Sequence, residues 1–204
     1  TMRKDLDTLE ARGLIKREHG YAILGSLEDI NNRLAFHYEV KRRIAAKAAS
    51  LVSDGETLMI ESGSCCALLA EELALNRQNV TIVTNSAFIA GYIRKTPGSK
   101  IILLGGDFQK ESQCMVGAIA RACAQNFFVD KLFVGTDGFS QRTGFTGKDH
   151  SRAGTVRDMA QQANNVVVLT ESSKFEQQGV VSLLQVQQVG TVITDAGIPA
   201  ESEA

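Results

Sequence analysis

The stretch TLMIESGSCCALLAEELALNRQNVTIVTNS, residues 57–86, indicates the fold class of this protein. Two short apolar runs, at 57–60 and 80–83, enclose a segment at 65–75 whose apolar residues have helical spacing. A strand, a helix and a second strand in this order form a unit whose two strands lie parallel in one sheet. Neither strand alternates between apolar and polar residues, which is typical of strands that are buried on both faces.

The same rhythm continues along the rest of the chain. Further apolar runs occur at 101–104, 132–134, 166–169 and 191–194, and further helical patterns at 87–94, 116–126, 151–162 and 180–188. The sequence therefore predicts an α/β fold with a mainly parallel sheet covered by helices on both faces.

The first 25 residues differ from the rest and are locally basic. Their apolar spacing predicts a helix that ends at Gly13, because glycine readily takes the left-handed conformation that follows a helix. Residues 14–17 and 21–24 are predicted to form a small hairpin around a turn at 18–20. We interpret residues 1–25 as one unit, 26–38 as a polar linker, and 39–204 as a large domain that opens with an amphipathic helix at 39–52.

The composition is ordinary for a globular protein, with 204 residues, 44% hydrophobic, 22% charged and a net charge of -1. This size suits one large domain with a small appendage. The near-zero charge argues against a protein that coats nucleic acid over its whole surface, but not against a small local DNA contact. No apolar run approaches the roughly 18–20 residues that span a bilayer, so no membrane partner is expected.

The cysteines are expected to be reduced thiols in a cytoplasmic protein. They are Cys65, Cys66, Cys114 and Cys123, and none forms a C-x-x-C pair. The adjacent pair Cys65-Cys66 would suit a redox or soft-metal sensor, but two small buried residues at the start of a helix are the favoured interpretation.

Polar residues follow nearly every predicted strand, and in open α/β sheets the ligand crevice lies at these carboxyl ends. Glycine lets a backbone approach a ligand closely, hydroxyls and helix N-terminal amides donate to phosphate oxygens, and acidic or amide side chains bind sugar hydroxyls. The candidate binding residues for a small polyhydroxylated anion are Glu61, Ser62, Gly63, Ser64, Thr84, Asn85, Ser86, Gly105, Gly106, Asp137, Gly138 and Lys174. For any one loop, ordinary helix capping is the favoured alternative, whereas several converging loops with a lysine favour binding.

Other kinds of site find little support. His19, His37 and His150 have no metal-ligand spacing with one another or with cysteine. Neither a G-x-S-x-G elbow nor a Walker A loop is present, and residues 135–138 do not match the dinucleotide-binding G-x-G-x-x-G pattern. No metal and no cofactor are therefore expected.

A set of short motifs follows one order along nearly the whole chain. They are RKDL at 3–6, LE at 9–10, GLI at 13–15, REHG at 17–20, KRRIA at 41–45, ESGS at 61–64, TNS at 84–86, LGG at 104–106, GTDG at 135–138 and SSKF at 172–175. Together they resemble the DeoR family of bacterial sugar-metabolism regulators. The chain departs from the usual family pattern at Glu61 and Glu171, where Asp is usual, at Ser64 and Cys65, where threonines are usual, and at Tyr21, where a second Gly is usual.

The resemblance implies a DNA-binding transcriptional regulator, expected to be a repressor, that responds to a phosphorylated sugar or a sugar acid bound by its C-terminal domain. Residues 1–25 would be the recognition helix and wing of a winged helix-turn-helix. The residues implied to contact operator DNA are Thr1, Arg3, Lys4, Lys16, Arg17 and His19. A two-fold operator implies a homo-oligomer, either a dimer or a tetramer.

The first residue is Thr rather than Met, and we expect this sequence to be a fragment of a longer protein. Without the supporting helices of a winged helix, such a fragment is predicted to sense its metabolite but to bind operator poorly.

An alternative function follows from the fold, because the family's effector domain resembles ribose-5-phosphate isomerase. The loop at 61–64 is similar to the isomerase phosphate loop, and Asp137 and Lys148 fall near its catalytic acidic segment and lysine, which adds Lys148 to the candidate effector-binding residues. An isomerase would use Asp137 as the base and Lys148 as the electrostatic partner of the enediolate. Two observations disfavour the enzyme. Gly138 and Phe139 stand where a second carboxylate would assist catalysis, and an isomerase function does not explain the basic N-terminal unit. A sensor rather than an enzyme is therefore predicted.

A pure interaction domain is a third interpretation, which saturable stabilisation by a sugar phosphate would exclude.

Overall fold

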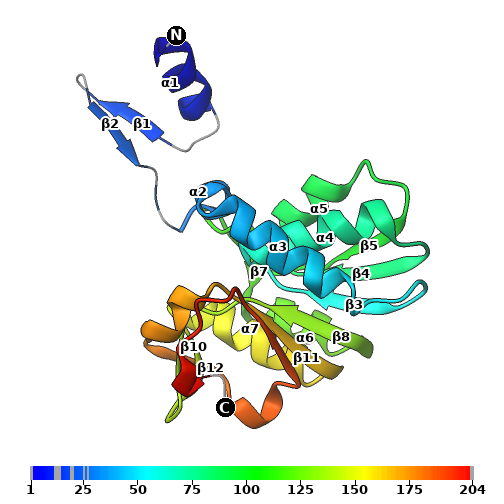
Figure 1. Ribbon diagram of the computed structural model, residues 1–204. Coiled ribbons are helices and arrows are strands. Elements are labelled where there is room, and N and C mark those ends of the chain that lie inside the picture. Colours follow the sequence, from blue (N-terminus) through cyan, green and yellow to red (C-terminus); the bar gives the residue numbers. More distant parts are fainter. Residues whose placement is uncertain (1, 12–14, 19–20, 25, 27, 203–204) are drawn as a thin grey trace.

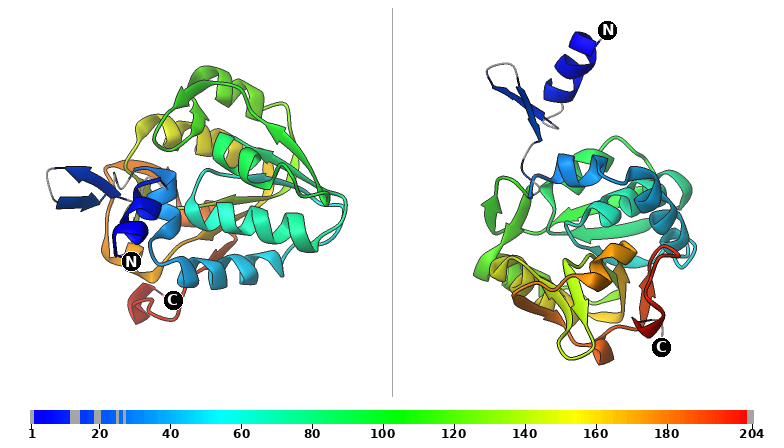
Figure 2. Two further views of the ribbon diagram at one scale, coloured as in Figure 1. Left: turned by 90° about the horizontal axis from the view of Figure 1, so that it is seen from above. Right: turned by 60° about the vertical axis from the view of Figure 1, so that its left-hand side comes forward.

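The computed structural model describes residues 2–11, 15–18, 21–24, 26 and 28–202. It begins with the helix α1 (Met2–Ala11) and an antiparallel hairpin of β1 (Ile15–Glu18) and β2 (Tyr21–Leu24). These elements lie apart from the body of the chain (Figure 1 and Figure 2). The predicted helix and hairpin are confirmed, whereas the expected helix end at Gly13, the first strand residue Leu14 and the turn residues His19 and Gly20 lie outside the described residues.

The centre of the protein is a six-stranded sheet in which every neighbouring pair is parallel. In spatial order the strands are β13 (Thr191–Ile193), β11 (Ala163–Leu169), β8 (Val129–Val134), β3 (Thr57–Ile60), β4 (Val80–Thr84) and β5 (Ser99–Leu103). From β3 the chain moves outward through β4 and β5, then returns to the other side of β3 with β8 and moves outward through β11 to β13. The strand order therefore reverses between β3 and β8, and the predicted parallel sheet is confirmed.

Helices cover both faces of this sheet, as predicted. One face packs against α3 (Tyr38–Ala49), α4 (Ser64–Asn76) and α5 (Ala87–Ile93), and the other against α6 (Gly117–Ala124) and α7 (His150–Ala160) (Figure 1). Among the described residues, none of the helices combines the length and apolar character that crossing a lipid bilayer requires.

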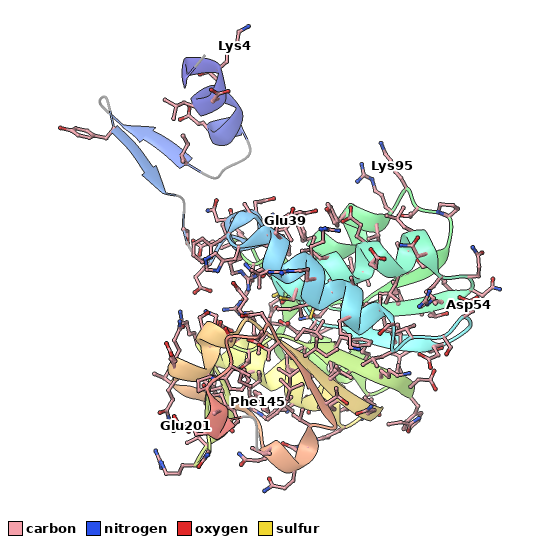
Figure 3. The ribbon with its side chains drawn as sticks, in the orientation of Figure 1. Lys4, Glu39, Asp54, Lys95, Phe145 and Glu201 are labelled. Carbon is pink, nitrogen blue, oxygen red and sulfur yellow. The ribbon has the colours of Figure 1, made fainter. Side chains whose placement is uncertain are left out.

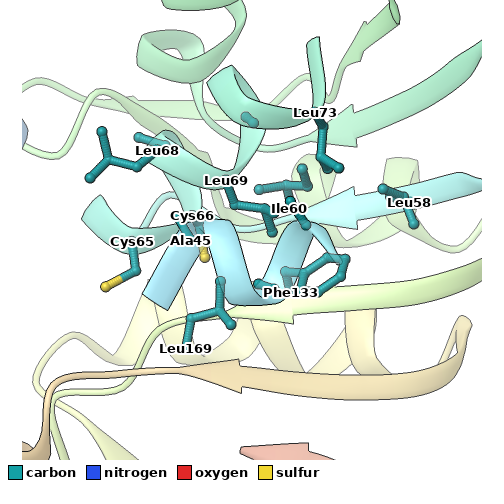
Figure 4. Packing of buried hydrophobic residues seen from close by; sticks show 14 of the residues in the cluster. Ala45, Leu58, Ile60, Cys65, Cys66, Leu68, Leu69, Leu73, Phe133 and Leu169 are labelled. Carbon is teal, nitrogen blue, oxygen red and sulfur yellow. The ribbon is translucent and has the colours of Figure 1, made fainter. Parts of the chain in front are cut away.

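The first of these two layers is built around α4, which is apolar on nearly all sides because it lies beneath α3 and against the sheet. Its Leu69 and Leu73 are fully buried and pack in one cluster with Ile60 of β3 and Phe133 of β8 (Figure 4). Residues alternate along these strands, so that Met59 and Leu132 belong to the cluster on the opposite face. The two clusters explain why the strands read as continuous apolar runs.

The second face also carries smaller antiparallel elements. A three-stranded sheet has the order β12 (Val181–Leu184), β10 (Gly144–Gly147), β9 (Gly138–Ser140), and a hairpin consists of β6 (Asp107–Gln109) and β7 (Cys114–Val116). Short 3-10 helices lie at η1 (Ser172–Glu176), between β11 and β12, and at η2 (Val186–Gln188) and η3 (Ala200–Ser202).

The helix predicted at 180–188 is wrong. Residues 181–184 form β12, which pairs with β10 and places Leu183 and Leu184 in the second apolar cluster, and only η2 in this segment is helical. The apolar run is too short for its spacing to distinguish a helix from a strand, and the free edge of β10 decides the outcome.

The segment expected to be a polar linker, 26–38, contains a helix. This helix, α2 (Ile30–Ala35), begins at Asp29, whose side chain accepts a hydrogen bond from the backbone N–H of Asn31 at 2.8 Å. Ile30 is fully buried, and Leu34, one turn later on the same face, packs against the α3–α4 cluster. An Asp cap and an apolar pair four residues apart therefore convert part of this segment into a helix attached to the large domain.

We expect truncation of Phe133 to Ala to destabilise the protein by about 3–5 kcal/mol, because the ring is fully buried and a cavity would replace it. Urea unfolding followed by circular dichroism measures the change. Phe128→Ala is the matched control: its ring is 85% exposed, so a change within about 0.5 kcal/mol is expected. Similar losses for both variants would contradict the packing described above.

Candidate ligand-binding site

A cavity of about 360 Å³ lies at the carboxyl ends of β3, β8 and β11. Its floor consists of the residues that follow these strands, and its walls come from α2, α3, the start of α7 and η1. The carboxyl ends of parallel strands meet at one edge of the sheet. Because the strand order reverses between β3 and β8, the loops that follow these two strands lead away in opposite directions and leave a crevice between them. The cavity therefore lies at the switch point of the sheet.

Some of the residues predicted from the sequence come together in this cavity. Those that line it are Glu61, Gly63, Ser64, Asp137, Lys148 and Lys174. All but Lys148 follow the neighbouring strands β3, β8 and β11, which are far apart in the sequence, as convergence of the loops requires, and Lys148 follows β10 of the smaller sheet.

Other predicted residues are buried beside the cavity and outside its lining. The Thr84 hydroxyl donates to the carbonyl of Ile60 at 2.6 Å, and the Asn85 amide donates to the carbonyl of Met115 at 3.1 Å. The Ser86 hydroxyl caps α5 by accepting from the N–H of Ile89. Thr84 ends β4 and the other two residues follow it, one strand away from the cavity, and their described hydrogen bonds are structural.

Three predicted glycines also lie outside the lining. A Cβ on Gly138 would come within 2.4 Å of the Gln177 carbonyl oxygen, so this glycine permits the close approach of β9 to the chain after η1. Gly106 has a φ of +146°, and a Cβ there would come within 2.7 Å of the Val116 carbonyl oxygen. Gly105 precedes it, after β5 at the edge of the sheet.

Glu61 is the central acidic residue of the cavity and is 7% exposed. Its carboxylate accepts a hydrogen bond from the Ser62 hydroxyl at 2.8 Å and another from the Gly135 N–H at 3.3 Å. Ser62 is fully buried, and its side chain orients Glu61. Glu61 thus links the loops after β3 and β8 and presents a fixed acceptor toward the cavity.

The N-terminus of α4 opens into the same space. Its N-cap is Gly63, and no side chain caps the first turn. A helix N-terminus with uncapped amides attracts anions through its N–H groups and its dipole. A Cβ at Gly63 would lie 3.0 Å from a Glu61 carboxylate oxygen and 3.5 Å from the Gly135 Cα, so glycine is what lets the two loops approach.

Lys41 of α3 is a buried cation in the wall of the cavity, with a side chain only 5% exposed. Its ammonium donates to the carbonyls of Arg33 and Phe36, each at 2.5 Å, and lies 3.4 Å from a Glu171 carboxylate oxygen. Burial lowers the pKa of Lys41, and the negative charge of Glu171 opposes this shift. The Glu171 carboxylate also lies 2.6 Å from Nδ1 of His37.

Arg152, at the start of α7, is the corresponding cation on the other side of the cavity. It is paired with Glu28 at 2.9 Å, and its own side chain is 12% exposed. Burial acts to lower the pKa of Arg152, but the nearby carboxylates of Glu61, Asp137 and Glu28 outweigh it and raise the pKa.

The groups that line the cavity indicate which kind of ligand it can bind. The cavity joins an uncapped helix N-terminus and several cations with fixed carboxylate and hydroxyl groups. This combination suits a small ligand that carries both an anionic group and hydroxyls. Within the described part of the chain, no cluster of His, Cys, Asp or Glu side chains is arranged to hold a metal ion.

The sequence interpretation missed several residues of the cavity, among them Arg33, Lys41, Arg152 and Glu171. Lys41 belongs to the KRRIA motif, and Arg152 follows Asp149, the cap of α7, so both had a local signal. Arg33 had none, because it lies in the segment interpreted as a linker.

The residues implied to contact DNA lie in the separate N-terminal elements. Arg3 and Lys4 belong to α1, and Lys4 is exposed (Figure 3). Lys16 and Arg17 belong to β1, whereas Thr1 and His19 lie outside the described residues. Their role in DNA binding stays a prediction.

Comparisons with known proteins agree on one family. Residues 36–196 match the family model described as the DeoR C terminal sensor domain. The glycerol-3-phosphate regulon repressor of Escherichia coli (strain K12) is 30% identical over 203 residues, which cover 98% of this chain and 80% of that protein. The HTH-type transcriptional repressor GlcR of Bacillus subtilis (strain 168) is 30% identical over 199 residues, covering 96% of this chain and 76% of that protein.

A solved structure shows the same fold. Ribose 5-phosphate isomerase A from Methanocaldococcus jannaschii superimposes with a TM-score of 0.51 at 21% identity, over 68% of this chain and 55% of that chain. At this level of identity the likeness concerns the fold alone.

The cysteine at the cavity yields a prediction. Cys65 lines the cavity, yet burial raises its pKa to about 12, so its thiolate fraction at pH 8 is on the order of 1 in 10,000. We expect Cys65 to resist iodoacetamide in the native protein, while the half-buried Cys123 is alkylated sooner. Peptide mass spectrometry of quenched time points measures both rates, and labelling in urea is the control. Fastest alkylation at Cys65 would support the redox-sensor alternative.

Proposed function

The chain belongs to the DeoR family of transcriptional regulators, and from this premise we propose that it is a repressor controlled by a phosphorylated sugar or a related sugar acid bound in the cavity. Residues 36–196 are the family's sensor domain, and the family is regulatory rather than enzymatic. Ligand binding would change the affinity of the N-terminal elements for operator DNA.

The observation that carries this proposal is the meeting of an uncapped helix N-terminus with cationic side chains in one cavity. The first turn of α4 offers backbone N–H groups, and Lys148 and Lys174, which have no described carboxylate partner, line the same space. A phosphate or carboxylate bound there would gain charge-assisted hydrogen bonds in a partly desolvated setting, where such bonds are strong.

The remaining polar groups suit the hydroxyls of a sugar. Glu61 and Asp137 present carboxylate oxygens, and Ser64 presents a hydroxyl. A volume of about 360 Å³ falls at the small end of the range for ligand pockets, which fits a metabolite rather than a dinucleotide.

The N-terminal elements supply the DNA-binding half of the proposal. A helix followed by a hairpin matches the recognition helix and wing of a winged helix, with the cations Arg3 and Lys4 near the start of α1 and Lys16 and Arg17 on β1. A homo-oligomer in the cytoplasm is expected, because a two-fold operator is bound by two copies of a DNA-binding unit.

The isomerase interpretation finds less support. Asp137, its general base, accepts a hydrogen bond from the backbone N–H of Lys148 at 3.0 Å, and Gly138 and Phe139 of β9 follow it without a second carboxylate. The shared fold does not carry the activity with it, because one fold serves many functions.

A thermal-shift panel tests the proposal. Ribose 5-phosphate, glucose 6-phosphate, fructose 6-phosphate, glycerol 3-phosphate and 6-phosphogluconate would each be titrated against the unphosphorylated counterpart. We expect at least one phosphorylated compound to raise the melting temperature saturably, by about 5–10 °C at 100 times its Kd, because it binds only the folded protein. No saturable shift with any of them at millimolar concentration would count against the proposal.

Lys174 provides a more specific prediction. It lines the cavity from η1, and its ammonium donates to the side chain of Gln177 at 3.3 Å. Lys174→Ala should weaken the Kd of the stabilising compound about tenfold or more, through loss of a charged hydrogen bond, and leave the ligand-free melting temperature nearly unchanged. Lys95→Ala, an exposed lysine remote from the cavity, is the matched control (Figure 3). Equal affinities in both variants would exclude Lys174 from the site.

A further inference from the structure

We propose that Arg33 of α2 binds the anionic group of the effector directly, so that the segment between the N-terminal hairpin and the sensor domain forms part of the effector site. This inference rests on the function proposed above and names a residue for it. The family match begins at residue 36, and α2 (Ile30–Ala35) precedes it.

The position of the Arg33 side chain supports this role. It lines the cavity, and its Nη2 lies 3.5 Å from the carbonyl oxygen of Ser62, the residue that precedes the N-cap of α4. The guanidinium therefore lies beside the helix N-terminus that offers its uncapped amides to an anion.

The hydrogen-bonding state of Arg33 points the same way. Its Nε is buried and has no hydrogen-bond partner, and within the described part of the chain no carboxylate pairs with this guanidinium. In contrast, Lys41 and Arg152 in the same cavity are each paired with a glutamate. A buried guanidinium donor without a partner is costly, and a phosphate or carboxylate oxygen is the partner that its planar fork suits best.

The neighbouring side chain adds a second open group. Asn32 also lines the cavity, and its buried Oδ1 has no hydrogen-bond partner. An amide oxygen accepts hydrogen bonds, so it suits a ligand hydroxyl. Arg33 and Asn32 together match a ligand that carries an anionic group and hydroxyls close to each other.

The helix that carries these residues is held firmly against the large domain. Ile30 is fully buried, and its N–H donates to the carbonyl of Glu111 at 3.1 Å. Glu28, just before the helix, is paired with Arg152, and the Lys41 ammonium binds the carbonyls of Arg33 and Phe36 at the helix end. The position of α2, which carries the guanidinium, is therefore set by contacts that do not involve a ligand.

A direct contact with α2 would couple ligand binding to the N-terminal elements. Only residues 25–29 separate β2 from α2, so a ligand that binds Arg33 binds the segment that leads to the hairpin. A ligand whose affinity differs between two arrangements of the N-terminal elements relative to α2 would shift the population of those arrangements.

The test uses the whole chain with inorganic phosphate as the probe, titrated at constant ionic strength and followed by thermal shift. Arg33→Gln should weaken phosphate binding about tenfold or more relative to the unsubstituted protein, because it removes a charged hydrogen-bond donor. Arg43→Gln is the matched control: Arg43 is an exposed arginine on α3 that is not part of the cavity lining, and the Kd should not change.

Hydrogen exchange provides the second measurement. Saturating phosphate should slow exchange of the α2 amides in the unsubstituted protein, and this protection should be lost in Arg33→Gln while the ligand-free exchange of the two proteins agrees. Arg33→Gln with an unchanged Kd, or phosphate protection at the start of α4 without any at α2, would overturn the inference. Failure of the unsubstituted protein to bind phosphate would also overturn it, whereas the sugar-phosphate panel decides separately on the proposed function.

Discussion

The pairing of β3 with β8 is the constraint on which the rest of the structure depends. It brings the loops at 61–64 and 135–137 side by side, although more than 70 residues separate them, and Gly63 and Gly135 allow their backbones to approach. The Gly135 N–H can then donate to Glu61, and α4 can begin at the cavity. Because β4 and β5 lie on the far side of β3, their loops have structural roles outside the cavity.

The cavity lining carries five acidic and five basic side chains, and the cations differ in whether a carboxylate is paired with them. Lys41 and Arg152 hold the segment before the sensor domain in place. Lys41 does so through hydrogen bonds to backbone carbonyls, and Arg152 through its ion pair with Glu28. Arg33, Lys148 and Lys174 have no described carboxylate partner, so these cations have capacity for an incoming anion. A ligand there is in contact with both the sheet domain and the segment that leads to α1 and the hairpin.

Much of the fold could be predicted because strands buried on both faces must be apolar throughout. The strands of the central sheet were therefore recognisable in the sequence as continuous apolar runs. The helix expected at 180–188 failed, since Val181–Leu184 satisfies a helix or a strand equally well and only the edge of β10 distinguishes them. The helix α2 was missed because its apolar face consists of only Ile30 and Leu34. About half of the predicted effector residues line the cavity. Arg33, Lys41 and Arg152 come from helices, and the local signals at Lys41 and Arg152 do not show that these helices form walls of the cavity.

The sequence by itself determined the alternation of strands and helices, the burial of the sheet on both faces and the motifs of the DeoR family, because these properties depend on residues close together in the chain. Only the tertiary structure decided which strand ends meet, which cations face one another and that α2 forms a wall of the cavity. The physical reason is that these contacts join segments far apart in sequence. They exist only after the hydrophobic burial of the sheet has set the strand order.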